Sequence, residues 1–237
     1  MNKTYLFILF ICCSYGFCEA NLKPLRESED VIVRRIDVIQ ETDENRYVYP
    51  DNVFSRTNQK GTESRLIIVH KLEFYANNKM TYEERLLIEL YNCRIWNLLS
   101  SIDKTKWLVA RDDVDLGKHQ SSLCLLYIDF NKGFIKEICT GFISYSISSD
   151  GDFIAYIKDY DYKNSKKMPY TVINTVTKKC RQKIWDYTLY VEDKTIQIPE
   201  LSFKEGYFWV TLYEDAAIIG KSKFDINTGE IVEYVQK

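Results

Sequence analysis

The densest group of side chains that could bind a metal or exchange protons lies in the segment RDDVDLGKH. It contains Asp112, Asp113, Asp115 and His119. Carboxylates this close together could ligate Ca²⁺, but a calcium loop needs alternating oxygen ligands, a glycine and a distal Glu. The segment lacks the distal acid and the spacing. We therefore predict a solvated acidic loop and no metal site.

The two histidines give little indication of catalysis. His70 lies within an apolar segment, whereas His119 has Asp113 and Asp115 nearby, and Ser121 or Ser122 could act as the nucleophile of a Ser-His-Asp arrangement. No G-x-S-x-G nucleophile elbow and no glycine-rich phosphate loop occur. We predict no catalytic residue and no cofactor. A carboxylate pair for glycoside cleavage stays open, because the separation of two carboxylates depends on the fold.

Two of the cysteines could form a disulfide. Cys124 and Cys139 flank a predicted turn at Asn131 and Lys132 symmetrically, so an antiparallel hairpin could set them opposite each other. If Gly133 shifts the register by one residue, the two side chains point to opposite faces and the bond cannot form. No CxxC spacing occurs, so neither a zinc site nor a thioredoxin-type motif is indicated.

The N-terminus has the layout of a secretory signal peptide. Lys3 precedes the uncharged run TYLFILFICC, and small residues permit cleavage after Gly16 or Ala20. The run is shorter than the roughly 20 residues of a membrane-spanning helix, and no later segment approaches that length. We predict that residues 1–20 are a signal peptide and that no transmembrane segment remains after its removal. The mature protein would be periplasmic, secreted or on the cell surface.

A lipid anchor is a disfavoured alternative for the N-terminus, because the residues before Cys12, Cys13 and Cys18 are bulky. The composition also limits the partners. A formal charge of −2 gives no general attraction to nucleic acid, and 46% hydrophobic residues allow a proper core. We expect a protein or glycan partner and no nucleic acid.

A strand-like segment recurs along the chain. DFIAYIKD, from Asp152, matches KWLVARDD, from Lys106, and YFWVTLYED, from Tyr207, and each follows a short polar corner. RLIIVHKLEF, from Arg65, is a weaker match. The segment from Met80 to Leu99 could form a helix, but it also fits the repeat as strands, and we predict strands.

A second landmark recurs in phase with the first. Asp129, Asn174 and Asp225 each stand where an apolar strand ends and a polar turn begins. Their side chains can accept hydrogen bonds from backbone amides two residues on, and Gly133 and Gly229 can adopt positive φ. The spacing of both landmarks is roughly 45 to 55 residues. Such a unit of four strands corresponds to one blade of a β-propeller.

We therefore predict an all-β fold, a β-propeller-like array of about four four-stranded blades. Residues 21–47 would form an N-terminal strand and linker, and 48–237 the propeller-like domain, with blades at about 48–96, 97–141, 142–196 and 197–237. Alternate residues of the second strands would meet opposite neighbours: Phe153, Ala155 and Ile157 one blade, Ile154 and Tyr156 the other. The strand at Asp30 to Gln40 could complete a fifth blade or close the ring on the last blade, and an open array is a third possibility.

The best-fitting blade resembles those of the TolB-like propeller superfamily. The resemblance rests on a Ser-x-Asp-Gly corner with an Ile-Ala-Tyr strand, and on a later Asp-x-x-Thr-Gly turn. The matching residues are Ser149, Asp150, Gly151, Ile154, Ala155 and Tyr156 in the first motif, and Asp225, Thr228 and Gly229 in the second. It implies a propeller and carries no catalytic motif.

The long loops between second and third strands are predicted to emerge on one face. They mix tyrosines with charges of both signs, which favours recognition of protein or glycan. The candidate ligand-binding residues are Tyr82, Asp112, Asp113, Asp115, His119, Tyr160, Asp161 and Tyr162. We predict a non-enzymatic binding or scaffolding module. The alternative is an envelope hydrolase with a carboxylate-lined central channel.

Overall fold

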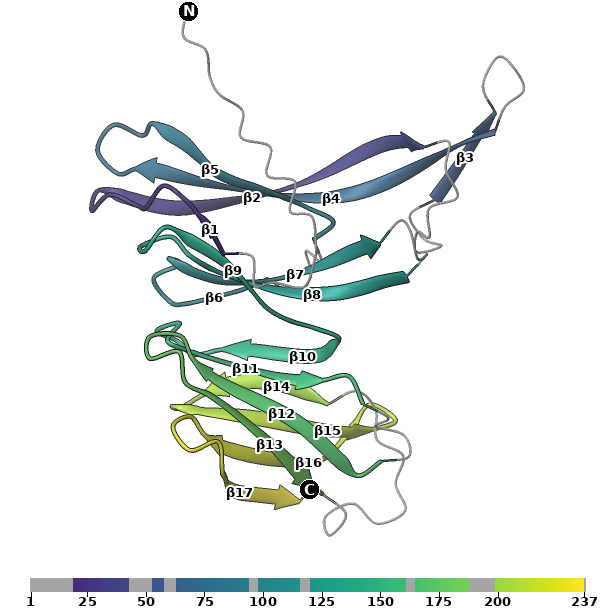
Figure 1. The fold of residues 1–237 in the computed structure, drawn as a ribbon, viewed down its shortest axis with the longest axis vertical. Helices are drawn as coiled ribbons and strands as arrows, with labels where there is room; N and C mark the ends of the chain where they lie inside the picture. The colour runs from purple at the N-terminus through teal and green to yellow at the C-terminus, as the bar shows by residue number, and fades with distance from the viewer. Residues whose placement is uncertain are drawn as a thin grey trace, which may run out of the picture.

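The protein is described by a computed structural model that covers residues 19–42, 53–57, 63–93, 98–115, 120–160, 165–187 and 199–236. In those ranges the structure has 17 strands and no helix, so the all-β prediction is confirmed. They form four antiparallel sheets that pack face to face in a row (Figure 1). Within the described ranges, no helix of the length and apolarity needed to cross a membrane is found.

The first sheet is built around the long strand β4 (Glu63–Asn78), which pairs along its whole length with β2 (Glu29–Thr42). The opposite edge of β4 is shared by β3 (Val53–Thr57) and β5 (Glu84–Tyr91). This differs from the predicted blade at 48–96, because β2 comes from the predicted linker. The prediction of strands instead of a helix after Met80 is confirmed by β5.

The second sheet has five strands. Its meander is β6 (Leu99–Ser100), β7 (Lys106–Asp115), β8 (Gln120–Asp129) and β9 (Phe134–Thr140). The short β1 (Glu19–Asn21) adds to the outer edge of β9, and the amide of Leu22 then donates to the carbonyl of Gly133. The N-terminal segments therefore join the first and second sheets, and neither β1 nor β2 closes a ring onto the last one.

The third and fourth sheets are regular four-stranded meanders. The third consists of β10 (Phe142–Ile147), β11 (Phe153–Lys158), β12 (Lys167–Asn174) and β13 (Cys180–Asp186). The fourth consists of β14 (Glu200–Lys204), β15 (Tyr207–Glu214), β16 (Ala217–Asp225) and β17 (Ile231–Gln236). Both orders follow the chain, as in a propeller blade.

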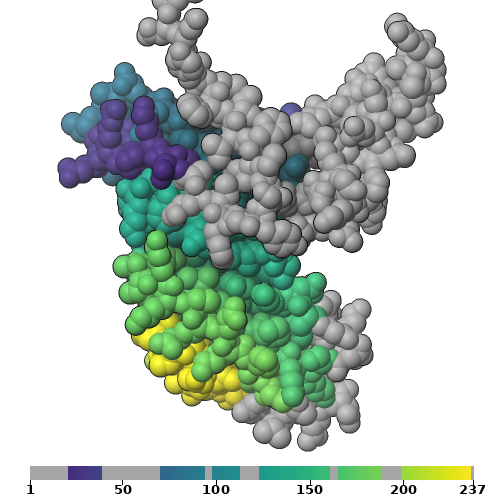
Figure 2. Space-filling view, in the orientation of Figure 1, coloured from purple at the N-terminus to yellow at the C-terminus, as the bar shows by residue number. Residues whose placement is uncertain are grey.

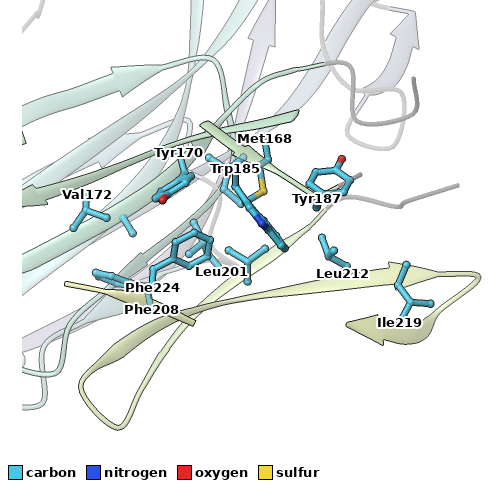
Figure 3. Close-up of a cluster of buried hydrophobic side chains, with 13 residues drawn as sticks. Met168, Tyr170, Val172, Trp185, Tyr187, Leu201, Phe208, Leu212, Ile219 and Phe224 are labelled. Carbon is cyan, nitrogen blue, oxygen red and sulfur yellow. The ribbon is translucent and has the colours of Figure 1, made fainter. Parts of the chain in front are cut away.

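Three apolar layers hold the four sheets together in the order first, second, third, fourth. Phe74 and Trp107 meet between the first two sheets, and Tyr127 and Ile154 belong to the layer between the second and third. The third layer joins the last two sheets (Figure 3); its fully buried members include Tyr187, Phe208 and Leu212. In Figure 2 the third and fourth sheets form one continuous mass below the second.

The predicted alternation along the second strands is confirmed. Ala155 and Ile157 lie in the layer shared with the fourth sheet, and Phe153 packs against it. Ile154 and Tyr156 lie in the layer shared with the second sheet. A strand that is apolar on both faces is thus explained by sheets on both sides of it.

The corners before the second strands repeat the same hydrogen bonds. The hydroxyls of Ser101 and Ser148 each donate to the aspartate two residues on, Asp103 and Asp150, at 2.5 Å. Each serine amide also bonds the carbonyl five residues later, that of Lys106 or Phe153. Lys106 is therefore equivalent to Phe153, so the sequence match that equated Trp107 with Phe153 is one residue out of step.

The predicted turns after the third strands are also present. Asn174 Oδ1 accepts from the amides of Val176 and Thr177 at 3.0 and 2.7 Å, and Asp225 Oδ1 accepts from Asn227 and Thr228 at 2.9 and 2.7 Å. Gly133 and Gly229 have φ values of 68° and 71°, as predicted. These bonds fix the ends of the hairpins that carry β13 and β17.

Candidate functional site

The predicted binding loops do not share one face. Tyr82 is 78% exposed in the β4–β5 turn, where the amide of Lys79 donates to the carbonyl of Ser28 at 2.8 Å. In Figure 1 this turn lies on the same side as the corners that precede β7 and β11. Strand β7 ends on the opposite side (Figure 1). The prediction of a common face is therefore wrong for the Tyr82 loop.

Of the remaining predicted residues, Asp112 and Tyr160 have described side chains. Asp112 is half-buried on β7, and its amide donates to the carbonyl of Asn92 at 2.8 Å. The hydroxyls of Tyr160 and Tyr187 lie 3.2 Å apart, and Tyr187 also donates to the carbonyl of Ser165 at 3.0 Å. Tyr160 thus supports a buried partner. His119, Asp161 and Tyr162 lie outside the described residues, as do the side chains of Asp113 and Asp115 and residues 1–18 of the predicted signal peptide.

The predicted disulfide between Cys124 and Cys139 is wrong. A bulge in the β8–β9 ladder sets Cys124 opposite Thr140 and Cys139 opposite Leu125. The two side chains therefore point to opposite faces, Cys124 into the layer with the first sheet and Cys139 toward the third. Both are free thiols, and burial raises the pKa of Cys139 to about 12.

A groove with a positively charged wall opens between the third and fourth sheets. We call it the basic groove; its volume is about 280 Å³, and its lining residues are Phe153, Val172, Asn174, Thr177, Lys179, Arg181, Ile226 and Asn227. Three apolar side chains line part of it, while Lys179 and Arg181 are exposed. In the described part of the chain, neither cation forms an ion pair, although Arg181 interacts electrostatically with Asp225. The groove can offer two cations to a ligand, one of them under the influence of that carboxylate.

The walls of the basic groove are held in place by contacts between the two sheets. The hydroxyl of Tyr170 donates to the carbonyl of Gly229, and Lys183 pairs with Glu230. Tyr170 also packs on Phe224, with ring centroids 4.4 Å apart. Burial raises the pKa of Tyr170, so its hydroxyl stays protonated and keeps donating. The turn after β16 is thereby fixed against β12 and β13.

A second groove lies on the other face of the same sheet. We call it the Ile184 groove; its volume is about 300 Å³, and it is lined by Lys158, Pro169, Tyr170, Thr171, Gln182, Lys183 and Ile184. Ile184 is 71% exposed beside Pro169, its partner in the β12–β13 ladder. The groove is more apolar than the basic groove.

The strand β13 separates the two grooves. The bonds at the two ends of the β12–β13 ladder show which residues of β13 hydrogen-bond to β12 and which direct their backbone groups outward. The amide of Asn174 donates to the carbonyl of Lys179, and that of Tyr187 to the carbonyl of Lys166, both at 2.9 Å. Because bonded and non-bonded pairs alternate in an antiparallel ladder, Arg181 and Lys183 bond to β12. The residues between and beside them direct their amides and carbonyls away from β12: Cys180, Gln182, Ile184 and Asp186. Among the described strands, none pairs with this outer edge.

Sequence reasoning missed this site. The run KKCRQKI after the turn at Asn174 carries four cations, but alternating polar residues are also typical of any solvated edge strand. The aliphatic Ile184 at the end of that polar run was the available signal. The position of the grooves themselves depends on how two sheets meet, which no local pattern contains.

Carboxylate pairs of the kind a hydrolase would use are neutralised by cations in the first sheet. Lys71 Nζ lies 2.5 Å from Glu73 and 3.1 Å from Glu89. Burial alone would raise the pKa of Glu73, but hydrogen bonds from Lys71 and Tyr75 hold it below its ordinary value. In the ranges that the structure describes, every carboxyl group with a shifted pKa is shifted downward, and no group of metal-binding side chains occurs: the shifted groups are Glu29, Glu73, Asp103, Asp150 and Asp225.

Comparisons with known proteins extend over the whole sheet array at low identity. No protein-family model and no curated protein matches the sequence. An acylaminoacyl peptidase from Pyrococcus horikoshii matches with a TM-score of 0.43 at 10% identity, over 92% of this chain and 32% of its own. The β-propeller domain of the Trilobed protease from Pyrococcus furiosus matches with a TM-score of 0.35 at 12% identity, over 92% and 85%. An oligogalacturonate lyase from Vibrio parahaemolyticus gives 0.37 at 12%, over 88% and 60%. This chain spans only 32% of the length of the peptidase, and similarities at these TM-scores transfer no activity to it.

Proposed function

We propose that the protein is an exported, non-enzymatic binding module that holds an acidic segment of a partner protein in the basic groove. The observation that carries this proposal is the pair of exposed cations, Lys179 and Arg181, beside an apolar lining. A guanidinium binds a carboxylate through two parallel hydrogen bonds, and a lysine adds a second charge. Rigid walls lower the entropy lost on binding.

The charges at the site favour binding over hydrolysis. The lining residues of the basic groove include no carboxylate that could act as an acid or a base. Elsewhere, Glu73 and Glu89 share the ammonium of Lys71, and a lowered pKa keeps Glu73 ionised, whereas a glycosidase acid needs a raised one. The hydrolase alternative has no comparable support.

The TolB-like resemblance and export are part of the same proposal. The serine of the corner is Ser148, one residue before the Ser149 matched from the sequence, because the Ser148 hydroxyl bonds Asp150. Ser101 and Asp103 form a second Ser-x-Asp corner with the same bond, which supports a common blade motif. Export rests on the signal-like sequence before Asn21. Mass spectrometry of the mature N-terminus tests it: a start at Phe17 or Asn21 is expected, and an intact Met1 would contradict it.

The binding proposal is tested with a fluorescein-labelled octaglutamate peptide and its octaglutamine counterpart in an anisotropy titration. Only the acidic peptide should bind, and its affinity should fall with salt. The double variant Lys179→Glu, Arg181→Glu should weaken binding at least tenfold. A matched control, Lys104→Glu with Lys204→Glu, makes the same change of net charge at exposed residues that do not line the groove and should bind as the wild type does.

Three results would overturn the proposal. In the first, the acidic peptide does not bind. In the second, both double variants weaken its binding equally, which would show that binding depends on the net charge of the protein and not on the groove. In the third, oligogalacturonate binds where the peptide does not, which would assign the groove to an acidic glycan.

A further inference from the structure

The outer edge of β9, in the second sheet, corresponds to the outer edge of β13 and is already paired with another strand. In the second sheet, β1 adds to β9, with Glu19 opposite Lys136 and Asn21 opposite Phe134. Strand β9 is the last strand of its meander, as β13 is of the next. The fold therefore accepts an added strand at the outer edge of a blade. The corresponding edge of the third sheet has no such strand among the described residues.

We propose that the acidic partner segment binds as an extra strand on the outer edge of β13, with acidic and apolar residues alternating along it. This inference rests on the proposed function and adds the mode of binding. The amides and carbonyls of Gln182 and Ile184 point outward, so they can form ladder hydrogen bonds with an extended peptide. Strand addition of this kind takes its affinity from main-chain bonds and its specificity from alternate side chains.

The two grooves dictate the alternation. Side chains of an added strand point in turn to the two faces of the sheet. On the face toward the fourth sheet they meet Lys179 and Arg181 of the basic groove. On the face toward the second sheet they meet Pro169 and Ile184 of the Ile184 groove. Carboxylates are complementary to the first face and aliphatic side chains to the second.

The peptide Glu-Val-Glu-Val-Glu-Val, labelled with fluorescein, tests the pattern against Glu-Glu-Glu-Val-Val-Val, which has the same composition and charge. We expect the alternating peptide to bind at least tenfold more tightly. N-methylation of its glutamate amides in one derivative, and of its valine amides in another, keeps the side chains and removes one set of ladder donors. One derivative should lose at least tenfold in affinity, because successive amides point to opposite edges of a strand.

A variant of the protein tests the ladder hydrogen bond that β13 itself would donate to the peptide. Gln182→Pro removes an outward amide and no bond to β12, whereas Gln182→Thr keeps the amide. The proline variant should bind the alternating peptide at least tenfold more weakly than the threonine variant, with a melting temperature close to that of the threonine variant. Selectively slowed amide exchange at Gln182 and Ile184 in the wild-type complex is the expected spectroscopic sign.

The outcomes separate the two proposals. If both Glu-Val peptides bind equally, and neither N-methylation nor Gln182→Pro has an effect, strand addition is refuted while charge-based binding in the basic groove stands. If neither these peptides nor octaglutamate binds, the proposed function fails and this inference fails with it.

Discussion

The aspartates at the blade corners act as local hydrogen-bond acceptors. Asp150 accepts from the hydroxyl of Ser148 at 2.5 Å and from the amide of Asp152 at 2.9 Å. Burial alone would raise the pKa of Asp150, but these bonds hold it below its ordinary value of 3.8. A lowered pKa means that the folded state binds fewer protons than the unfolded one. The stabilisation is therefore present above about pH 4 and is lost as the pH falls toward the folded-state pKa.

Replacing Asp150 by Asn tests this role. The change removes the charged acceptor and should lower the free energy of unfolding at pH 7 by about 0.5–1.5 kcal/mol. Urea denaturation at pH 7 and pH 3 should also show a smaller loss of stability on acidification than in the wild type. The control is Asp159→Asn, an exposed carboxyl on which no corner depends. An equal effect of both substitutions would contradict the role given to the corner.

Residue types revealed the turns better than the binding site. Asn174 and Asp225 were predictable because a side chain that accepts hydrogen bonds from amides two and three residues on is a local device. Arg181 was not predictable, because its importance comes from Ile226 and Asn227, which a different sheet brings to the same groove. The Cys124–Cys139 prediction failed at a single bulged residue, whose insertion reverses the face of everything beyond it.

At the scale of single elements, the placement of β1 requires the backbone of Leu22, which follows it, to pass very close to Gly133. A Cβ at that position would lie 2.5 Å from the carbonyl oxygen of Leu22. The φ of 68° is also in the left-handed region that disfavours other residues. Both constraints make glycine necessary where the N-terminal segment crosses the β8–β9 turn.

The substitution Gly133→Ala should therefore displace β1 as well as strain the turn. Gly206→Ala is the matched control, because Gly206 has a φ of 79° and nothing within 4 Å of its hypothetical Cβ. The control should lose about 1–2 kcal/mol of stability, the usual penalty of the left-handed region. Gly133→Ala should lose more and should also speed amide exchange at Leu22 and Leu25. Equal effects of both substitutions would show that β1 is not held by this contact.

Strand pairing was predicted where the chain forms hairpins and missed where it does not. Both regular meanders pair neighbouring segments, so turn residues locate them. The first sheet instead pairs β2 with β4 across a long separation, with Glu29 opposite Asn78 and Thr42 opposite Arg65. Such pairing depends on the apolar face that Val31 and Leu72 share against the second sheet, which is a tertiary property.

At the scale of the whole molecule, the four sheets are stabilised in series. Each apolar layer joins one pair of neighbours, so the stability of an end sheet depends on a single layer, as in other repeat proteins. The second and third sheets each have two such layers. A defect in one layer should therefore act mainly on the sheets beside it.

Leu212→Ala, in the layer between the third and fourth sheets, tests this arrangement. Deleting a fully buried leucine side chain should lower the stability by about 2–5 kcal/mol. Hydrogen exchange should accelerate in β15 and β16 more than in β4, which lies at the other end of the row. Val232→Ala, at a side chain that is 56% exposed, is the control and should change little. Uniform acceleration would instead indicate one cooperative unit.

If the proposed leader is removed, the position of β1 would link that cleavage to the state of the second sheet. A leader peptidase that cuts after Gly16 would leave Glu19–Asn21 complete on β9, whereas a cut after Ala20 would leave Asn21 alone of that strand. In the second case, the backbone groups of β9 that face Glu19 and Ala20 would become vacant when the leader departs. Proteolytic processing would then create a new acceptor edge, available to another chain only in the mature protein.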